Sequence, residues 1–195
     1  MATLQNARVT PEEYLERERK ADYKSEYWNG EIVAMAGGSE QHSLITVNIS
    51  GELRARLRDR PCRTYSSDLR VRTTRTRYFY PDVSVVCGEP EFADEDMDML
   101  TNPGVLVEVL SPSTEDKDRG LKFVFYQQIP MLTDYVMVSQ DEPHVEHYAR
   151  QGSDRWLLTN LRGLDVVLRL PSIGCELPLS EVYARVAFPP AEEGD

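Results

Sequence analysis

The amino-acid sequence predicts a mixed α/β or α+β domain. The first observation behind this is the order of the predicted elements, in which helical segments are separated by groups of strands. The second is the length, since 195 residues most simply form one domain with a sizeable core. The third is an ordinary globular composition of 41% hydrophobic and 28% charged residues. We therefore expect a single domain over residues 1–187, followed by a flexible tail over residues 188–195.

The first part of the chain predicts two helices and a hairpin. Thr10-Pro11-Glu12-Glu13 combines a capping threonine, a proline at the first helical position and a glutamate in capping-box register, so a helix should run to about residue 20. Asn29-Gly30 predicts a two-residue turn between strands at 24–28 and 31–36. Ser39 can cap a second helix, with apolar residues at roughly helical spacing as far as residue 58.

Most of the remaining elements are predicted strands. Short runs rich in β-branched and aromatic residues indicate strands at 62–66, 68–73, 78–87, 105–110, 134–139, 144–150, 155–161 and 166–170. The acidic stretch at 89–98 is expected to form a mobile surface loop. A helix should begin at a cap on Ser113 or Thr114 and end near residue 128, and a last short helix is predicted at 179–183.

Several classes of protein are disfavoured by composition. No apolar run approaches the roughly 20 residues that cross a bilayer, and no charged segment leads into an apolar one at the N-terminus, so we expect neither a membrane span nor a signal peptide. Cys62, Cys87 and Cys175 are odd in number and never in C-x-x-C spacing, which argues against a zinc cluster and for a reducing cytoplasm. The predicted location is therefore cytoplasmic.

Two predicted strands each contain one carboxylate. Asp82 lies near the start of the apolar run at 80–87, and Glu108 lies in the middle of the run at 105–110. An acid in a core strand is costly to bury unless a cation or hydrogen-bond partners compensate. We therefore expect the two strands to run side by side, with the two acids sharing a metal ion.

A basic segment contrasts with the net charge of −11. Between Arg54 and Arg77 the chain has nine arginines and two aspartates, a net of +7, which leaves −18 for the rest. The overall balance argues against a protein that coats nucleic acid non-specifically. The arginines are either an ordinary solvated surface or a patch that faces phosphates, since guanidinium groups suit phosphate oxygens.

The helix predicted after Glu108 contains a candidate functional lysine. Asp118, Lys122 and Tyr126 stand at i, i+4 and i+8 and so share a helical face. They indicate either an exposed Asp–Lys pair or a lysine delivered towards the two acids.

These motifs resemble the putative restriction endonuclease family, a mostly uncharacterised bacterial family within the PD-(D/E)XK nuclease superfamily. The resemblance rests on Tyr-Pro-Asp-Val at 80–83, Val-Glu-Val-Leu-Ser-Pro-Ser-Thr at 107–114 and Asp-Arg-Gly-Leu-Lys-Phe at 118–123. It extends from Thr-Pro-Glu-Glu-Tyr-Leu at 10–15, through Asn-Gly-Glu-Ile-Val-Ala-Met-Ala at 29–36, to the closing segment at 177–183. It implies a restriction endonuclease-like core, a mixed β-sheet flanked by helices, with additional N- and C-terminal strands.

The resemblance also implies roles for particular residues. Asp82 and Glu108 match the metal-binding acids, and the backbone carbonyl of Val109 is a third expected ligand. The superfamily pattern places a lysine two residues past the second acid, but this chain has Leu110 there. Lys122 on the next helix then matches the catalytic lysine, and Lys117 is a weaker substitute.

Further residues are weaker matches. Glu31 resembles an auxiliary acid for a second metal ion, and the alternative is an exposed strand-end glutamate. His42 resembles a family histidine, against the alternative of an ordinary surface histidine near a helix end. The arginines expected to face nucleic acid are Arg70, Arg72, Arg75 and Arg77.

The function implied is a metal-dependent endonuclease that hydrolyses phosphodiester bonds of DNA with Mg²⁺ or Mn²⁺. Carboxylates and water are the ligands these ions prefer, and a bound ion would polarise the phosphodiester and activate a water molecule. One alternative is a catalytically inactive nuclease fold that binds nucleic acid or a protein. Another is a metal hydrolase of a small phosphorylated molecule. A homodimer is the default expectation, because superfamily members that cut both strands often dimerise.

Overall fold

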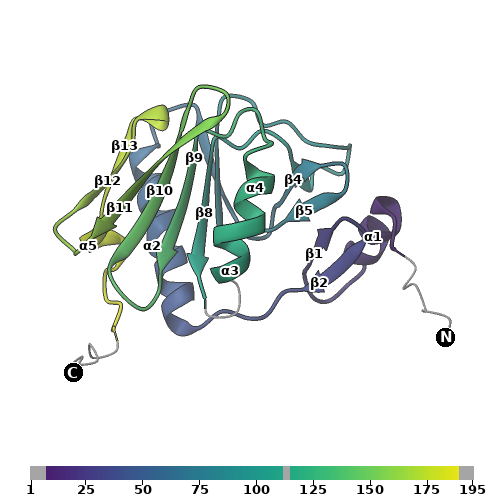
Figure 1. Ribbon diagram of the computed structural model, residues 1–195, viewed down its shortest axis with the longest axis horizontal. Helices are drawn as coiled ribbons and strands as arrows, with labels where there is room; N and C mark the ends of the chain where they lie inside the picture. The colour runs from purple at the N-terminus through teal and green to yellow at the C-terminus, as the bar shows by residue number, and fades with distance from the viewer. Residues whose placement is uncertain (1–7, 112–114, 189–195) are drawn as a thin grey trace.

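The computed structural model describes residues 8–111 and 115–188 and confirms the mixed α+β architecture (Figure 1). Its strands form a five-stranded sheet, a six-stranded sheet and a two-stranded ribbon. The cap candidates Ser113 and Thr114 lie outside the described residues, as does the predicted tail apart from Phe188. One domain over residues 1–187 stays a prediction.

The five-stranded sheet lies at the N-terminal end of the molecule and carries helix α1 (Pro11–Glu18). Its strand order is β2-β1-β5-β4-β7. The strands are β1 (Ser25–Trp28), β2 (Glu31–Ala34), β4 (Arg70–Thr74), β5 (Arg77–Phe79) and β7 (Met99–Leu100). Helix α1 begins with the predicted capping box of Thr10 and Glu13, and it buries Tyr14 against the rings of Tyr27 and Tyr78.

The six-stranded sheet forms the centre of the molecule, in the order β11-β10-β9-β8-β6-β3. Strands β8 and β9 are parallel and the other neighbours are antiparallel. The strands are β3 (Cys62–Ser66), β6 (Val83–Cys87), β8 (Val105–Leu110), β9 (Asp134–Ser139), β10 (His144–Gln151) and β11 (Arg155–Arg162).

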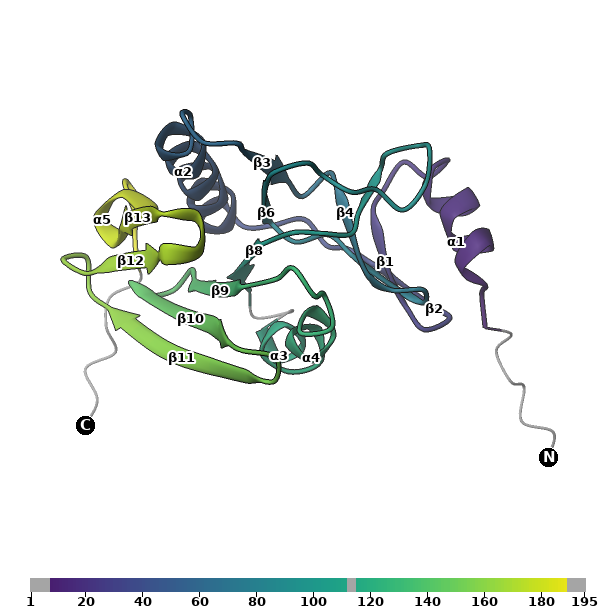
Figure 2. The ribbon, with the colours of Figure 1, turned by 90° about the horizontal axis from the view of Figure 1, so that it is seen from above.

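Helices cover both faces of this sheet, as the view from above shows (Figure 2). Helix α2 (Glu40–Arg56) lies on one side. On the other lies a continuous helical segment made of α3 (Glu115–Lys117), a π-helical turn (Asp118–Lys122) and α4 (Phe123–Tyr126). The C-terminal ribbon and α5 pack against α2; this group comprises β12 (Val167–Leu170), a 3₁₀ turn (Pro171–Ile173), β13 (Cys175–Pro178) and α5 (Leu179–Val182). No helix in the described part of the chain is both long and apolar enough to cross a bilayer.

Strand β8 is buried on both faces, which explains its continuous apolar sequence. Val105, Val107 and Val109 belong to the core beneath α2, whereas Leu106 and Leu110 belong to the core beneath α4. Because successive side chains alternate between faces, Glu108 points to the α4 side.

The prediction of one strand over residues 78–87 was wrong. The chain forms β5 and β6 instead, and these strands belong to different sheets. Tyr80, Pro81 and Asp82 make the crossing between them. Proline cannot donate a ladder hydrogen bond, so Pro81 suits such a break. Asp82 therefore lies at the junction of the two sheets rather than inside a strand.

The acidic segment at 89–98 is held by cations in the structure. The Arg19 guanidinium forms ion pairs with Asp94, Asp96 and Asp98 at 2.7–2.9 Å, and Arg70 also pairs with Asp98. Three of the acids therefore tie this segment to the N-terminal sheet and its helix.

The cysteines also differ from expectation. Cys62 on β3 lies directly opposite Cys87 on β6, and the two form a disulfide. Cys175 is a buried free thiol. Cys62 and Cys87 are 25 residues apart, and their pairing depends on strand register, so it could not be predicted from the sequence. The cysteines therefore no longer argue for a reducing compartment.

Candidate active site

Asp82 and Glu108 lie close together, next to the paired strands β6 and β8, and both line one pocket. Strands β6 and β8 pair antiparallel with Val83 opposite Val107, so Asp82 stands opposite Glu108 one position further along. The Val109 amide donates a hydrogen bond of 2.7 Å to Asp82 Oδ2, which fixes the Asp82 carboxylate across the strand pair. The two acids that the sequence singled out are therefore neighbours.

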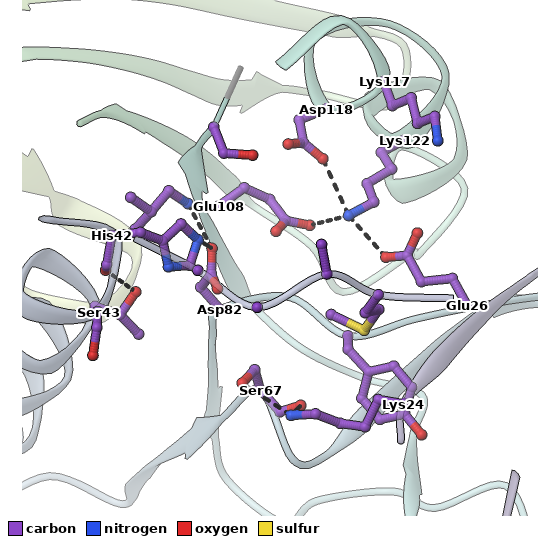
Figure 3. Close-up of a pocket in the computed structure, with 18 of the residues that line it drawn as sticks. Lys24, Glu26, His42, Ser43, Ser67, Asp82, Glu108, Lys117, Asp118 and Lys122 are labelled. Atoms are coloured by element: carbon purple, nitrogen blue, oxygen red, sulfur yellow. Dashed lines mark hydrogen bonds and ion pairs between the residues drawn. The ribbon is translucent and has the colours of Figure 1, made fainter. Parts of the chain in front are cut away.

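Lys122 completes this group from the helical segment (Figure 3). Its amine lies 3.3 Å from Glu108 Oε1, 3.1 Å from Asp118 Oδ1 and 2.8 Å from Glu26 Oε1. Asp118 and Lys122 are the first and last residues of the π-helical turn, and both side chains are buried. Such single π turns are frequent at functional sites.

Burial shapes the electrostatics of the acid–lysine group. The side chains of Lys122 and Glu108 are only 6% and 5% exposed. Burial raises the pKa of Glu108 well above its usual range; the Lys122 ammonium opposes this shift and the neighbouring carboxylates add to it. Burial lowers the pKa of Lys122, but the three carboxylates around the amine outweigh it and hold the pKa well above normal. Lys122 is therefore a fixed positive charge.

The Glu108 carboxylate is also oriented by a neighbouring hydroxyl. Tyr126 donates a hydrogen bond of 2.7 Å to Glu108 Oε1. Tyr126 follows Lys122 by one helical turn, so the helical segment that supplies the lysine also positions this acid.

His42 approaches Asp82 from helix α2. Its Nε2 lies 3.3 Å from Asp82 Oδ2. The hydrogen bond with Asp82 raises the pKa of His42 against the opposing effect of burial, and the Val109 carbonyl adds to the increase. The Ser39 hydroxyl accepts a hydrogen bond of 3.0 Å from the His42 backbone amide. The residue that caps α2 therefore also positions this histidine.

Gly38 allows the preceding segment to pass close to the histidine ring. A Cβ at this position would lie 2.8 Å from His42 Nδ1. A larger residue would therefore require the His42 side chain to move.

The acids, His42 and Lys122 line a pocket of about 740 Å³ between the two larger sheets. The acids and Lys122 form its inner part. Further side chains come from the segment after β2, from α2 and from the junction near Tyr80. Lys24 and Lys117 also line this pocket.

The structure brings together only part of the predicted residue set. Glu31 is exposed on β2 and does not line the pocket. The acid that reaches Lys122 from the N-terminal hairpin is Glu26 on β1, which the sequence analysis missed. One pattern could have indicated it, since Glu26 is an acid inside the short run Ser25–Trp28 of otherwise buried or half-buried residues.

The predicted arginines do not line the pocket either. Arg70 is buried, with a side chain 4% exposed, and pairs with Asp98. Arg77 lies over the ring of Phe125, 4.0 Å from its centroid. Arg72 is half-buried and Arg75 is exposed at the turn between β4 and β5. Among the described residues, the lysines that line the pocket besides Lys122 are Lys24 and Lys117.

The donor chemistry of the site fits a hard divalent cation. Among the described residues, no three His, Cys, Asp or Glu side chains are grouped as a metal site on their own. Asp82, Glu108 and the Val109 carbonyl offer oxygen donors only, and Mg²⁺ commonly takes one or two carboxylates and keeps several water molecules. Four carboxyl groups surround one buried lysine and one histidine here. A divalent cation beside Glu108 would favour the ionised form of this acid, against the burial that raises its pKa.

Comparison with known proteins places the chain in a family. A family model described as "putative restriction endonuclease", named Uma2, matches residues 11–180. Two uncharacterized proteins of Synechocystis sp. are similar, sll1609 at 42% identity over 80% of this chain and 88% of the relative, and slr1290 at 39% identity over 93% and 94%.

A solved structure shares the fold. The crystal structure of a putative nuclease from Anabaena variabilis superposes on this chain with a TM-score of 0.75 at 20% sequence identity. The superposition covers 92% of this chain and 99% of the nuclease chain. The fold predicted from the sequence is thus confirmed, and since the family model spans most of the chain, this protein belongs to the Uma2 family of putative restriction endonucleases.

Proposed function

We propose that this protein is a metal-dependent nuclease that hydrolyses phosphodiester bonds of DNA. The observation that carries the proposal is the Lys122 amine, held beside Glu108 and next to Asp82 in a single pocket. The family and the fold support a nuclease. Asp82, Glu108 and the Val109 carbonyl would hold Mg²⁺ or Mn²⁺, which when bound polarises a phosphodiester and lowers the pKa of a coordinated water molecule.

Lys122 acts as an electrostatic group in this proposal. Its raised pKa keeps the amine protonated at neutral pH, so it cannot serve as the proton acceptor. A fixed positive charge in a buried site instead stabilises negative charge that develops on the phosphoryl oxygens in the transition state. Glu26 and Asp118 keep the amine in place for this role.

The remaining side chains orient the acids. The Val109 amide and His42 both contact Asp82 Oδ2, and Tyr126 contacts Glu108 Oε1. Each carboxylate thus has one oxygen fixed by protein groups. Groups that are preorganised in this way need little reorientation during a reaction.

The test measures cleavage of plasmid and oligonucleotide DNA in Mg²⁺ or Mn²⁺. Asp82→Ala and Lys122→Ala should each reduce the rate by about 100-fold or more, the usual cost of losing an electrostatic group at a reacting centre. Glu26→Gln should reduce it because the Lys122 amine loses an anionic partner. Glu31→Gln is the matched control: it alters the same residue type on the same hairpin, outside the pocket, and should leave the rate unchanged.

Two results would count against the proposal. If the wild-type protein cuts no better than the Asp82 and Lys122 variants on any substrate, the pocket is not a nuclease site. Binding of DNA that is unaffected by metal ions and by these substitutions would instead support an inactive binding fold.

A further inference from the structure

The depth of the acid–lysine group restricts which substrates can reach it. Glu108 and Lys122 are 5% and 6% exposed, whereas Asp82 and His42 at 14% and 20% are more accessible. A phosphodiester must therefore enter the pocket to meet all of these groups, because contact with the protein surface alone does not reach the lysine.

The size of the pocket sets the second restriction. Its volume of about 740 Å³ falls within the range of clefts that enclose small ligands. Double-stranded DNA is a much larger object, since its major groove alone is about 12 Å wide. A pocket of this size can accommodate one or two nucleotides, whereas a base-paired helix could only lie across its mouth.

The chemistry of the remaining wall suits nucleobases and sugars. The end of β2 and the residues after it contribute small apolar side chains, Val33, Ala34 and Ala36. Helix α2 adds Val47, whose side chain is 64% exposed. An unpaired nucleotide is complementary to an apolar surface beside a charged reacting centre, because its base has an apolar face and its phosphate is charged.

Two lysines are placed to hold flanking phosphates. Figure 3 shows Lys24 and Lys117 on opposite sides of the group formed by Glu108, Lys122 and Glu26. Lys117 ends α3 and Lys24 directly precedes β1, so the two side chains reach the pocket from different elements. The Lys24 amine pairs with Asp68 at 3.0 Å and contacts the Ser67 carbonyl at 3.1 Å, and since the Asp68 side chain is 84% exposed, a phosphate would replace a solvent-exposed partner. Phosphates on either side of a bound nucleotide could each meet one lysine.

We propose that the pocket takes unpaired nucleotides, so that the substrate is a single strand, or a single-stranded overhang or bulge, and not an intact duplex. This inference rests on the proposed nuclease function and names its substrate class. The arginines of the β4–β5 hairpin play no part in this mode of binding, because they do not line the pocket.

The first experiment measures binding by the full chain rather than cleavage. Fluorescence anisotropy with a labelled 12-nucleotide single strand, the same sequence as a blunt duplex, and a duplex carrying a single-stranded overhang is recorded in EDTA and in Ca²⁺. We expect the single strand to bind at least about tenfold more tightly than the blunt duplex, a difference of about 1.4 kcal/mol, because only an unpaired base can contact the apolar wall. Binding of the overhang as tight as the single strand would show that an end suffices.

Substitutions then locate the binding site. Val47→Glu should weaken single-strand binding by about tenfold, because it removes an apolar contact and adds a negative charge. Val124→Glu is the matched control, since Val124 is 51% exposed on α4 and does not line the pocket. Lys117→Met should reduce the slope of log affinity against log salt concentration by about 0.7.

The outcomes separate this inference from the proposed function. Equal or tighter binding of the blunt duplex, no detectable binding of either DNA, or equal effects of Val47→Glu and Val124→Glu would overturn the inference. If the duplex also proved the better substrate in an Asp82-dependent reaction, the nuclease function would stand and only the inference of a single-stranded substrate would fail. If no DNA and no small phosphodiester such as bis(p-nitrophenyl) phosphate were cleaved, the nuclease function would fail, whatever the binding preference.

Discussion

At the scale of single residues, the most demanding feature is the buried charge of Lys122. The amine has three carboxylate partners and almost no access to water. Buried ion pairs seldom add net stability, but removing one partner is costly because the other charges stay buried and unpaired.

Lys122→Met should therefore lower the free energy of unfolding by about 3 kcal/mol or more at pH 7, measured by urea denaturation. The double variant Lys122→Met/Glu108→Gln should recover part of that loss, because it removes one of the unpaired carboxylates. Lys20→Met is the control; its pair with Glu16 is 72% and 71% exposed and screened by water, so the change should leave the free energy of unfolding close to that of the wild type. Equal losses at the two lysines would mean that the Lys122 pairs do not exist in solution.

A second buried acid, Asp134, predicts how stability depends on pH. His147 Nε2 lies 2.7 Å from Asp134 Oδ1, and the hydroxyls of Thr133 and Ser172 donate to Asp134 Oδ2. Burial acts to raise the pKa of Asp134, but these hydrogen bonds outweigh it and the pKa is lowered. An acid with a lowered pKa stabilises the fold above its unfolded-state pKa, near 3.9, and this stabilisation is lost as pH falls through the folded-state value.

Asp134→Asn should thus cost about 2 kcal/mol at pH 7. The difference from wild type should shrink as pH falls below about 4. Denaturant melts at several pH values measure this, with Asp165→Asn on the exposed surface as a control that should stay within about 0.5 kcal/mol of wild type. A difference between Asp134→Asn and wild type that does not change with pH would contradict the assignment.

Residue types predicted part of the candidate site. Asp82, Glu108 and Lys122 stand out because charged groups sit in apolar surroundings, and the structure brings them together. Glu26 could not be separated from Glu31 in this way, because both lie on one short hairpin and only the sheet packing decides which acid faces Lys122. Arg70 was expected to face nucleic acid but is buried, and this could not be predicted because its partner Asp98 is 28 residues away in the sequence.

At the scale of elements, patterns local in the sequence were reliable and those set by distant contacts were not. The capped helices, the Asn29-Gly30 hairpin and the strand at 105–110 formed as predicted. The division of 78–87 between two sheets depends on partners far along the chain. The π turn likewise interrupts a segment whose spacing predicted a regular helix.

The attachment of α4 to the sheet gives a prediction at this scale. The Arg150 guanidinium on β10 donates to the carbonyls of Gln127, Ile129 and Leu132 just after α4, at 2.6–3.0 Å. These carbonyls lie at and beyond the helix end, where partners within the helix run out. One side chain therefore ties the segment that carries Lys122 to the central sheet.

Arg150→Met should destabilise the protein by about 2 kcal/mol, because several charge-assisted hydrogen bonds are lost together. Hydrogen exchange measured by mass spectrometry should become faster over residues 123–132. Arg155→Met on the exposed part of β11 is the matched control and should leave exchange in that segment unchanged. Unaltered exchange in Arg150→Met would show that the helix is held by its apolar face alone.

At the scale of the whole molecule, charge and site position must be considered together. The net charge of −11 opposes the approach of a polyanion. The basic segment could compensate only if it lay at the pocket, but its arginines at 70, 72, 75 and 77 do not line it. The sequence shows that these arginines are close together along the chain, but their different surroundings in the fold, from buried Arg70 to exposed Arg75, could not be predicted from it.

The dependence of binding on salt tests this distribution of charge. If Lys24 and Lys117 make the phosphate contacts, two contacts at about 0.7 each give a slope of about −1.4 for log affinity against log salt concentration. Single-strand binding should then weaken only about sevenfold between 50 and 200 mM salt. Arg75→Gln, at the exposed turn between β4 and β5, should leave the slope unchanged. A slope of about −4 or steeper, reduced by Arg75→Gln, would mean that nucleic acid follows the arginine surface and that the pocket lysines are not its main contacts.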